Sequence, residues 1–165
     1  MRFTKEHRIE LSASRFIECS FEPEFLKRMN LSAMGVQTFE TQSRDVDGDI
    51  WTIKNRVTPA DNMPGFIKKL VGQSFYYDEV VTHKKGSDTI TATMTPSVLR
   101  DKFKMSYTLR VHPLGESACR RVMDWDIEIK IFGIGGQVEK FAAGQVESGL
   151  EQSASYMSKN PPAAH

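Results

Sequence analysis

The chain has 165 residues, enough for one domain with its own core, and its 22 basic and 21 acidic residues almost cancel. Without a cluster of Lys and Arg, nucleic-acid binding has little support, and no apolar run approaches the roughly 20 residues of a membrane span. The charged N-terminal residues do not resemble a signal peptide, and Cys19 and Cys119 lie far apart. We therefore predict a soluble cytoplasmic protein with two structural thiols, no nucleic-acid partner and no stable membrane insertion.

In chain order, the sequence predicts a strand, two short helices, a series of strands and a long helix. The first strand alternates polar and apolar residues over 2–11. Ser12 or Ser14 can cap the first helix, and the second covers 24–30 after a proline. The later strands are recognised by two-residue alternation and by the turn residues between them. They are expected over 34–46, 50–57, 74–83, 89–94, 102–111 and 122–131, with Asp47-Gly48 as the strongest hairpin signal.

The strand over 122–131 has the strictest alternation. One face carries apolar residues such as Trp125, and the other carries Asp124, Asp126 and Glu128. Because the tryptophan face is expected to be dry, the acids should face water. We interpret them as a charged outer ladder rather than as a pair of catalytic acids.

Two further segments have helical character. Residues 137–159 place their apolar side chains along one stripe, which predicts a long amphipathic helix. Residues 64–72 are bounded by Pro and Gly, and they form either a lid that can touch a membrane or a short helix that plugs one end of a cavity; the plug is preferred. The domain is predicted over 1–160, followed by a disordered tail at 161–165.

Four local motifs add to this element order: Asp61-Asn62-Met63-Pro64-Gly65, Lys69-Leu70-Val71-Gly72, Ile131-Phe132-Gly133-Ile134-Gly135-Gly136 and Val138-Glu139-Lys140. Together they resemble an uncharacterised bacterial family of the START/SRPBCC superfamily, which includes the pollen-allergen-like proteins. The resemblance implies an α+β helix-grip fold. In this fold a curved antiparallel sheet of about seven strands wraps around a long C-terminal helix, two short helices follow the first strand, and a cavity lies between sheet and helix.

The candidate ligand-binding residues are bulky side chains on the inward faces of the strands and the long helix. By periodicity they are Trp51, Ile53, Phe103, Met105, Tyr107, Met123, Trp125 and Phe141. Gln145 either offers its amide to a ligand or borders the apolar stripe of the helix. His7 shares a strand face with apolar residues, so it is either a ligand anchor or, more commonly, a buried histidine with satisfied hydrogen bonds.

Other polar residues are candidates for sites of chemistry. Glu79 shares a strand face with aromatic residues and would need a partner or a raised pKa there, although twist or a bulge turning it to solvent is the preferred interpretation. The four histidines lack the spacing of a zinc site. The acids of 45–49 lack the glutamate and the glycine position of a calcium loop, so they are interpreted as a hairpin turn. We predict no metal and no cofactor.

The resemblance and the apolar inward faces predict binding, transport or sensing of a small hydrophobic or amphipathic, lipid-like molecule. One alternative is a cyclase- or dehydrase-type enzyme that uses the same cavity, with His7, Tyr107 or Glu79 handling protons. Another is a protein-interaction module, as in the chaperone-activator branch of the superfamily, which would expose an apolar patch instead of enclosing a cavity. The sequence alone does not separate the three.

Overall fold

The computed structural model describes residues 1–162, so the last three residues of the predicted tail, 163–165, lie outside the described residues. The described chain folds as one strand, two helices, two strands, a helix, four strands and a long helix. The helices are α1 (Ala13–Cys19), α2 (Pro23–Ser32), α3 (Gly65–Val71) and α4 (Gly135–Lys159). The strands are β1 (Arg2–Ile9), β2 (Thr38–Asp47), β3 (Ile50–Thr58), β4 (Tyr77–Lys84), β5 (Thr89–Pro96), β6 (Phe103–Pro113) and β7 (Cys119–Ile129).

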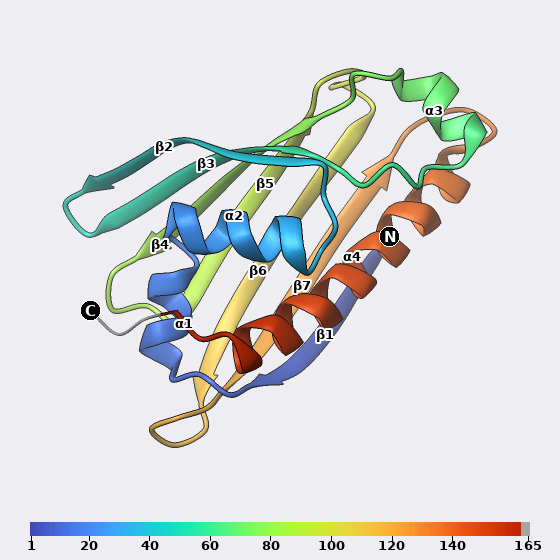
Figure 1. Cartoon of the computed structure of the whole chain (residues 1–165). Helices are drawn as coiled ribbons and strands as arrows, with labels where there is room; N and C mark the ends of the chain where they lie inside the picture. The colour runs from blue at the N-terminus through green and yellow to red at the C-terminus, as the bar shows by residue number, and fades with distance from the viewer. Residues whose placement is uncertain (163–165) are drawn as a thin grey trace.

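The strands form a single antiparallel sheet in the order β1-β7-β6-β5-β4-β3-β2. Strands β2 to β7 follow one another as neighbours, and β1 pairs with β7, so the first and last strands of the chain lie side by side. The sheet is curved, and α4 runs along its concave face over β1 and β7, with α2 beside it over the other half of the sheet (Figure 1). This is the α+β helix-grip fold that the family resemblance implies.

Local chemistry accounts for the element ends. Ser12 caps α1 by accepting a hydrogen bond of 3.2 Å from the backbone N–H of Arg15. The β2–β3 hairpin turns at Gly48, whose φ of +58° favours glycine. Strand β2 begins at Thr38, later than the predicted residue 34, because the chain still turns at Gly35 with a φ of +68°.

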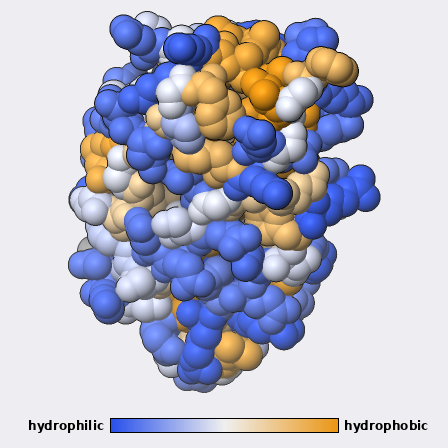
Figure 2. Space-filling model, turned by 90° about the vertical axis from the view of Figure 1, so that its right-hand side faces the viewer, coloured by the Kyte–Doolittle hydropathy of each residue, from blue (hydrophilic) through white to orange (hydrophobic). Residues whose placement is uncertain are grey.

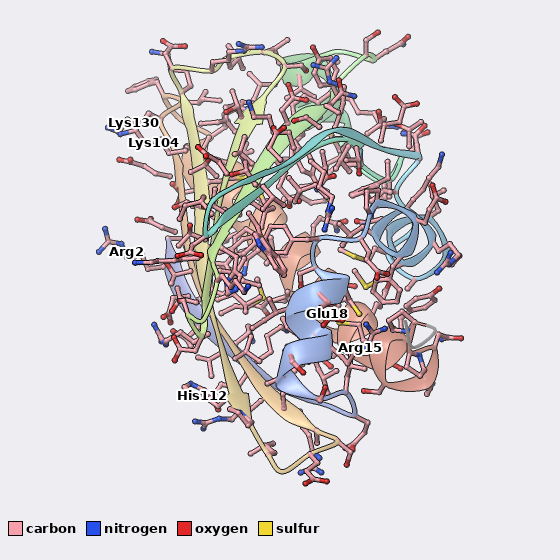
Figure 3. The ribbon with its side chains drawn as sticks, turned by 90° about the vertical axis from the view of Figure 1, so that its left-hand side faces the viewer. Arg2, Arg15, Glu18, Lys104, His112 and Lys130 are labelled. Carbon is pink, nitrogen blue, oxygen red and sulfur yellow. The ribbon has the colours of Figure 1, made fainter. Side chains whose placement is uncertain are left out.

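The alternation in β7 has the predicted consequence. Trp125 is 6% exposed on the inner face, whereas on the outer face Asp124 and Asp126 pair with side chains of neighbouring strands and Glu128 pairs with Lys130. Asp124 accepts hydrogen bonds from Thr4 at 2.6 Å and from Arg110 at 2.7 Å. Charged residues such as Arg2, Lys104 and Lys130 point away from the sheet on this side (Figure 3). The prediction of a charged outer ladder is confirmed.

Both cysteines are buried and unpaired. Burial raises the pKa of the Cys19 thiol to about 12 and that of Cys119 to about 11, so both stay protonated and unreactive at neutral pH. Within residues 1–162, no helix combines the length and the apolar character needed to cross a bilayer.

Candidate functional site

A cavity of about 430 Å³ lies between the concave face of the sheet and the helices. Its wall is mainly apolar and comes from β3 to β7, from α4, and from residues such as Phe16 of α1, Met29 of α2 and Ile67 of α3. The volume is within the range of small-molecule sites in proteins.

Seven of the ten predicted site residues line this cavity. They are Phe103, Met105, Tyr107, Met123, Trp125, Phe141 and Gln145. All of the strand residues in this group lie on the neighbouring strands β6 and β7, where the register places Met105 opposite Ile127 and Tyr107 opposite Trp125. The Tyr107 and Trp125 rings contact each other, with centroids 4.8 Å apart. The alternation therefore brings these side chains to one wall.

Trp51 and Ile53 lie outside the cavity wall, and the expectation that they line it is corrected. Both are on the inner face of β3, but the segment that joins α1 to α2 covers them. Phe21 packs edge-on against Trp51 with a centroid distance of 5.6 Å, and His83 approaches the same ring at 5.6 Å. Ile53 has no exposed surface and belongs to the packed core. The inward face of β3 is thus filled where helices cover it.

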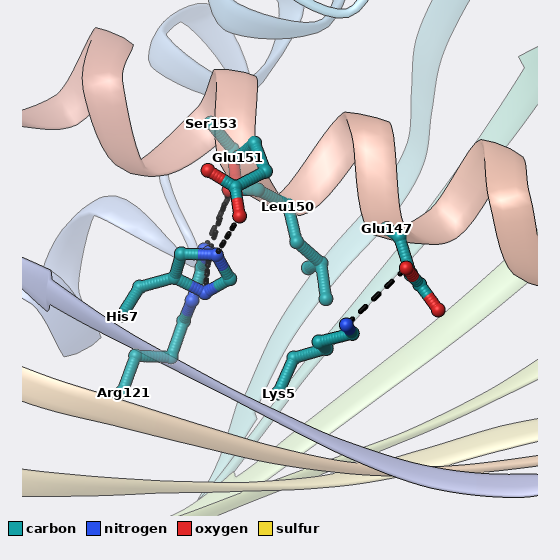
Figure 4. A network of polar contacts seen from close by, with 7 residues as sticks. All are labelled: Lys5, His7, Arg121, Glu147, Leu150, Glu151 and Ser153. Atoms are coloured by element: carbon teal, nitrogen blue, oxygen red, sulfur yellow. Dashed lines mark hydrogen bonds and ion pairs between the residues drawn. The ribbon is translucent and has the colours of Figure 1, made fainter.

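His7 also lies outside the cavity wall. It projects from β1 toward α4, where its Nε2 is 3.3 Å from the Oε1 of Glu151 and its Nδ1 is 3.3 Å from a guanidinium nitrogen of Arg121 (Figure 4). Since a guanidinium only donates, Nδ1 accepts, and the proton is on Nε2, which donates to Glu151. His7 is therefore a bridge between strand and helix, with both ring nitrogens satisfied.

The cavity reaches the surface at a polar rim on α4. Among its lining residues Asn62, Gln145, Ser148 and Gln152 are exposed. The Nδ2 of Asn62 donates to the Oε1 of Gln145 at 3.0 Å, so the loop after β3 is tied to α4 across the rim. In this structure Gln145 uses its carbonyl oxygen for that contact.

The helix α3 contributes to the cavity wall, and the plug interpretation of this segment stays a prediction. Ile67 and Val71 face the cavity and are almost fully buried, while Phe66 is exposed on the other side. Phe132, in the turn between β7 and α4, is fully exposed as well. Apolar side chains gather in the upper part of the face shown in Figure 2, on the side where Figure 1 places α3 and this turn.

Glu79 faces the cavity from β4, so the preferred expectation that it turns to solvent is wrong. The register places it directly opposite Asn55 of β3, whose Nδ2 donates to Glu79 Oε1 at 3.2 Å. Asn55 is in turn held by Thr41, which donates to its Oδ1 at 2.9 Å. Burial raises the pKa of the Glu79 carboxyl above its ordinary value, and the bond from Asn55 opposes this only in part.

Two tyrosines add hydroxyl groups to the same wall. Tyr77 and Tyr107 line the cavity, and within residues 1–162 neither hydroxyl has a protein hydrogen-bond partner. Burial raises the pKa of both hydroxyls, nearby Glu79 adds to the effect, and Arg121 opposes it for Tyr107. The hydroxyls are therefore neutral and free to bond a molecule in the cavity.

Arg121 is a charged lining residue that the sequence interpretation missed. It is 3% exposed and lies on β7 in phase with Met123 and Trp125. An arginine in phase with a dry strand face was a usable signal, because such a residue must find partners inside the protein. Among the described residues no group of three or more His, Cys, Asp or Glu side chains is arranged to hold a metal ion.

Comparison with solved structures shows which class of protein has this architecture. A START superfamily protein from Mycobacterium smegmatis matches with a TM-score of 0.64 and 18% identity, over 98% of this chain and 99% of that one. The Zhui aromatase/cyclase from Streptomyces sp. R1128 matches with a TM-score of 0.67 and 9% identity, over 99% and 96%. Norcoclaurine synthase from Thalictrum flavum, in complex with dopamine and hydroxybenzaldehyde, matches with a TM-score of 0.65 and 13% identity, over 99% and 89%.

These likenesses establish the fold: the chain has the helix-grip architecture of the START/SRPBCC superfamily. Within that class, residues 4–159 match the model of the family described as "Protein of unknown function (DUF2505)", and the chain belongs to this family. Comparison with curated proteins gives no significant match.

Proposed function

We propose that this protein binds a small hydrophobic or amphipathic molecule in the cavity between the sheet and α4, and that it acts as a carrier or sensor of that molecule. The observation that carries the proposal is the cavity itself, about 430 Å³ within a domain whose remaining inner face is packed. Native interiors rarely leave such space empty. Each 100 Å² of apolar ligand surface removed from water would contribute about 2.5 kcal/mol of binding free energy.

The wall supports an amphipathic occupant rather than a purely apolar one. Phe103, Met105 and Phe141 offer apolar contact, whereas Tyr77 and Tyr107 offer hydroxyls without protein partners. A few polar groups in an apolar wall are typical of sites that orient a small molecule. The two buried, unpaired thiols support a reducing location such as the cytoplasm.

The test is binding of a neutral apolar fluorescent probe, N-phenyl-1-naphthylamine, to the wild type and to a variant with a filled cavity. Ala142 lines the cavity from α4, so Ala142→Phe places a ring in that space. Ser155 is exposed on the same helix, and Ser155→Phe is the matched control. We expect the wild type and the control to bind the probe and Ala142→Phe to lose most of its affinity. Absence of binding to the wild type would contradict the proposal.

A second candidate function, acid–base catalysis in the same cavity, has one specific observation in its favour. Glu79 is a buried carboxyl of raised pKa whose wall also carries the Tyr77 and Tyr107 hydroxyls. Such perturbed groups are typical of catalytic acids. Mass spectrometry of a ligand that co-purifies with the protein would separate the two functions: a carrier returns it unchanged after prolonged incubation, whereas an enzyme converts it and Glu79→Gln does not.

A further inference from the structure

Arg121 brings a positive charge into the cavity wall, and its contacts leave that charge without a carboxylate partner. Within residues 1–162, its guanidinium donates to the Oγ of Ser153 at 3.0 Å, to the carbonyl oxygen of Leu150 at 2.8 Å and to the Nδ1 of His7 at 3.3 Å (Figure 4). All three acceptors are neutral. The Nε–H of Arg121 is buried and has no hydrogen-bond partner.

The carboxylate nearest to this group along the hydrogen-bond network does not touch it. Glu151 is reached only through His7, and its side chain is 76% exposed, so water screens its charge. Desolvation lowers the pKa of Arg121 to about 10, which still leaves the guanidinium positive at neutral pH. A buried charge without a direct counter-charge is costly for a protein.

Apart from Arg121, Glu79 is the ionisable acidic or basic side chain among the described lining residues, and it does not supply that counter-charge. Within residues 1–162 it makes no ion pair with Arg121: it accepts a hydrogen bond from Asn55, and strands β5 and β6 lie between its strand β4 and the strand β7 of Arg121. Its burial also favours the neutral carboxyl. Within residues 1–162, the guanidinium of Arg121 therefore has no direct counter-charge in the cavity wall.

We propose, building on the ligand-binding function above, that Arg121 anchors the carboxylate of an amphipathic carboxylic acid whose apolar part fills the cavity. A carboxylate carries one negative charge, which matches the one unpaired cation. A carboxylate oxygen is also a strong acceptor for the Nε–H of Arg121, which has no partner among the described residues. A phosphate group would bring more negative charge into the cavity than Arg121 can neutralise.

A purely structural role of Arg121 accounts for only part of these contacts. The bonds to Ser153 and Leu150 tie β7 to α4, which explains why a donor stands at this position. A neutral donor would make such bonds without bringing a charge into the interior. The charge and the unpaired Nε–H are explained when the partner is an anion that enters with the ligand.

The experiment compares two ligands that differ only in the head group. The affinity of the wild type for dodecanoate and for dodecan-1-ol is measured by displacement of N-phenyl-1-naphthylamine at neutral pH, where the acid is ionised. The same pair is then tested on Arg121→Met, which keeps the apolar stem, and on Arg121→Lys, which keeps the charge. Arg120→Met is the matched control, because Arg120 is the neighbouring residue on the outer face of β7 and its ion-pair partner is Glu6.

We expect the wild type and Arg120→Met to bind dodecanoate about 10- to 100-fold more tightly than dodecan-1-ol, the difference typical of a charge-assisted hydrogen bond. Arg121→Met should lose this preference while still binding the probe and the alcohol, and Arg121→Lys should keep part of it. Should Arg121→Met fail to fold, the proposal is tested by the ratio of the affinities for dodecanoate and dodecan-1-ol in the wild type and in Arg121→Lys. Equal affinity of the wild type for both ligands would overturn the carboxylate proposal alone, whereas failure of probe and both ligands to bind would overturn the proposed function itself.

Discussion

Replacing Glu79 by Gln should stabilise the protein at neutral pH, because it removes a carboxyl that the cavity wall keeps away from water. Glutamine has the same shape, and its carbonyl oxygen can accept the hydrogen bond that Asn55 now gives to Glu79 at 3.2 Å. The substitution therefore changes the ability to ionise and little else. Any pH-dependent difference between the two proteins reports the charge of Glu79.

The sign and slope follow from proton linkage. Burial raises the folded-state pKa of Glu79 above its ordinary value of 4.5, so between these two values the folded state binds more protons than the unfolded state. The wild type therefore loses stability as pH rises through this window, by about 1.4 kcal/mol for each pH unit. Above the folded-state pKa the loss is complete and constant. Glu79→Gln should thus match the wild type at about pH 4 and exceed it increasingly as pH rises.

The assay is urea denaturation of both proteins at several pH values between about 4 and 8, with the free energy of unfolding taken from the midpoint and slope. A difference between variant and wild type that stays the same at every pH would refute the reasoning. The internal control is the neighbouring Asp78, whose hydrogen bonds to Arg56 at 2.8 and 3.0 Å lower its pKa. Asp78→Asn should cost at most about 1 kcal/mol, since the pair is partly exposed, and because the lowered pKa lies below this pH range the cost should stay nearly constant across it.

Two further changes probe the helix and the rim. Gly135→Ala should destabilise the protein by about 1–3 kcal/mol in the same urea assay, because the added Cβ would collide with the backbone carbonyl oxygen of Ile129. At Gly136 an added Cβ meets no atom within 4 Å, so Gly136→Ala should be neutral or stabilising. Equal effects of the two substitutions on the free energy of unfolding would contradict this packing. Asn62→Ala removes the bond to Gln145 across the rim, so stopped-flow measurement should show faster probe entry and release with little change in affinity. Gln145→Ala should raise the rates of probe entry and release by the same factor, and the double variant Asn62→Ala/Gln145→Ala should raise them no further. Additive effects of the two substitutions would contradict a single shared contact.

Alternation along the chain was sufficient to predict which face of each strand is dry. It placed Trp125 inside and Asp124 outside, and both positions are confirmed because a period of two leaves no third option once the register is set. The glycine-rich break before α4 and the apolar stripe of that helix gave the long helix to within two residues, since Gly135 rather than residue 137 begins it. The order of these elements then indicated the helix-grip fold.

Whether an inward side chain meets a cavity or packed core was decided by the tertiary structure alone. Trp51 and Met105 obey the same alternation, yet Phe21 packs against Trp51 whereas Met105 lines the cavity. That difference depends on where α1 and α2 cross the sheet, which is set by contacts between segments far apart in the chain.

The polar residues of the wall show the same limit. The sequence places Glu79 and Arg121 on inward faces by their phase, but phase alone does not state what lies opposite. Glu79 stays inside because the pairing of β3 with β4 places Asn55 beside it as a hydrogen-bond donor. Arg121 stays inside because α4 passes over β7 and offers it acceptors at Leu150 and Ser153. The sequence by itself predicted the elements and their dry faces, since these depend on local periodicity, and the family resemblance carried by its motifs implied the fold. Only the tertiary structure decided which inward groups share the cavity and which of them lack a partner, because hydrogen bonds and charge compensation there join residues that the sequence holds apart.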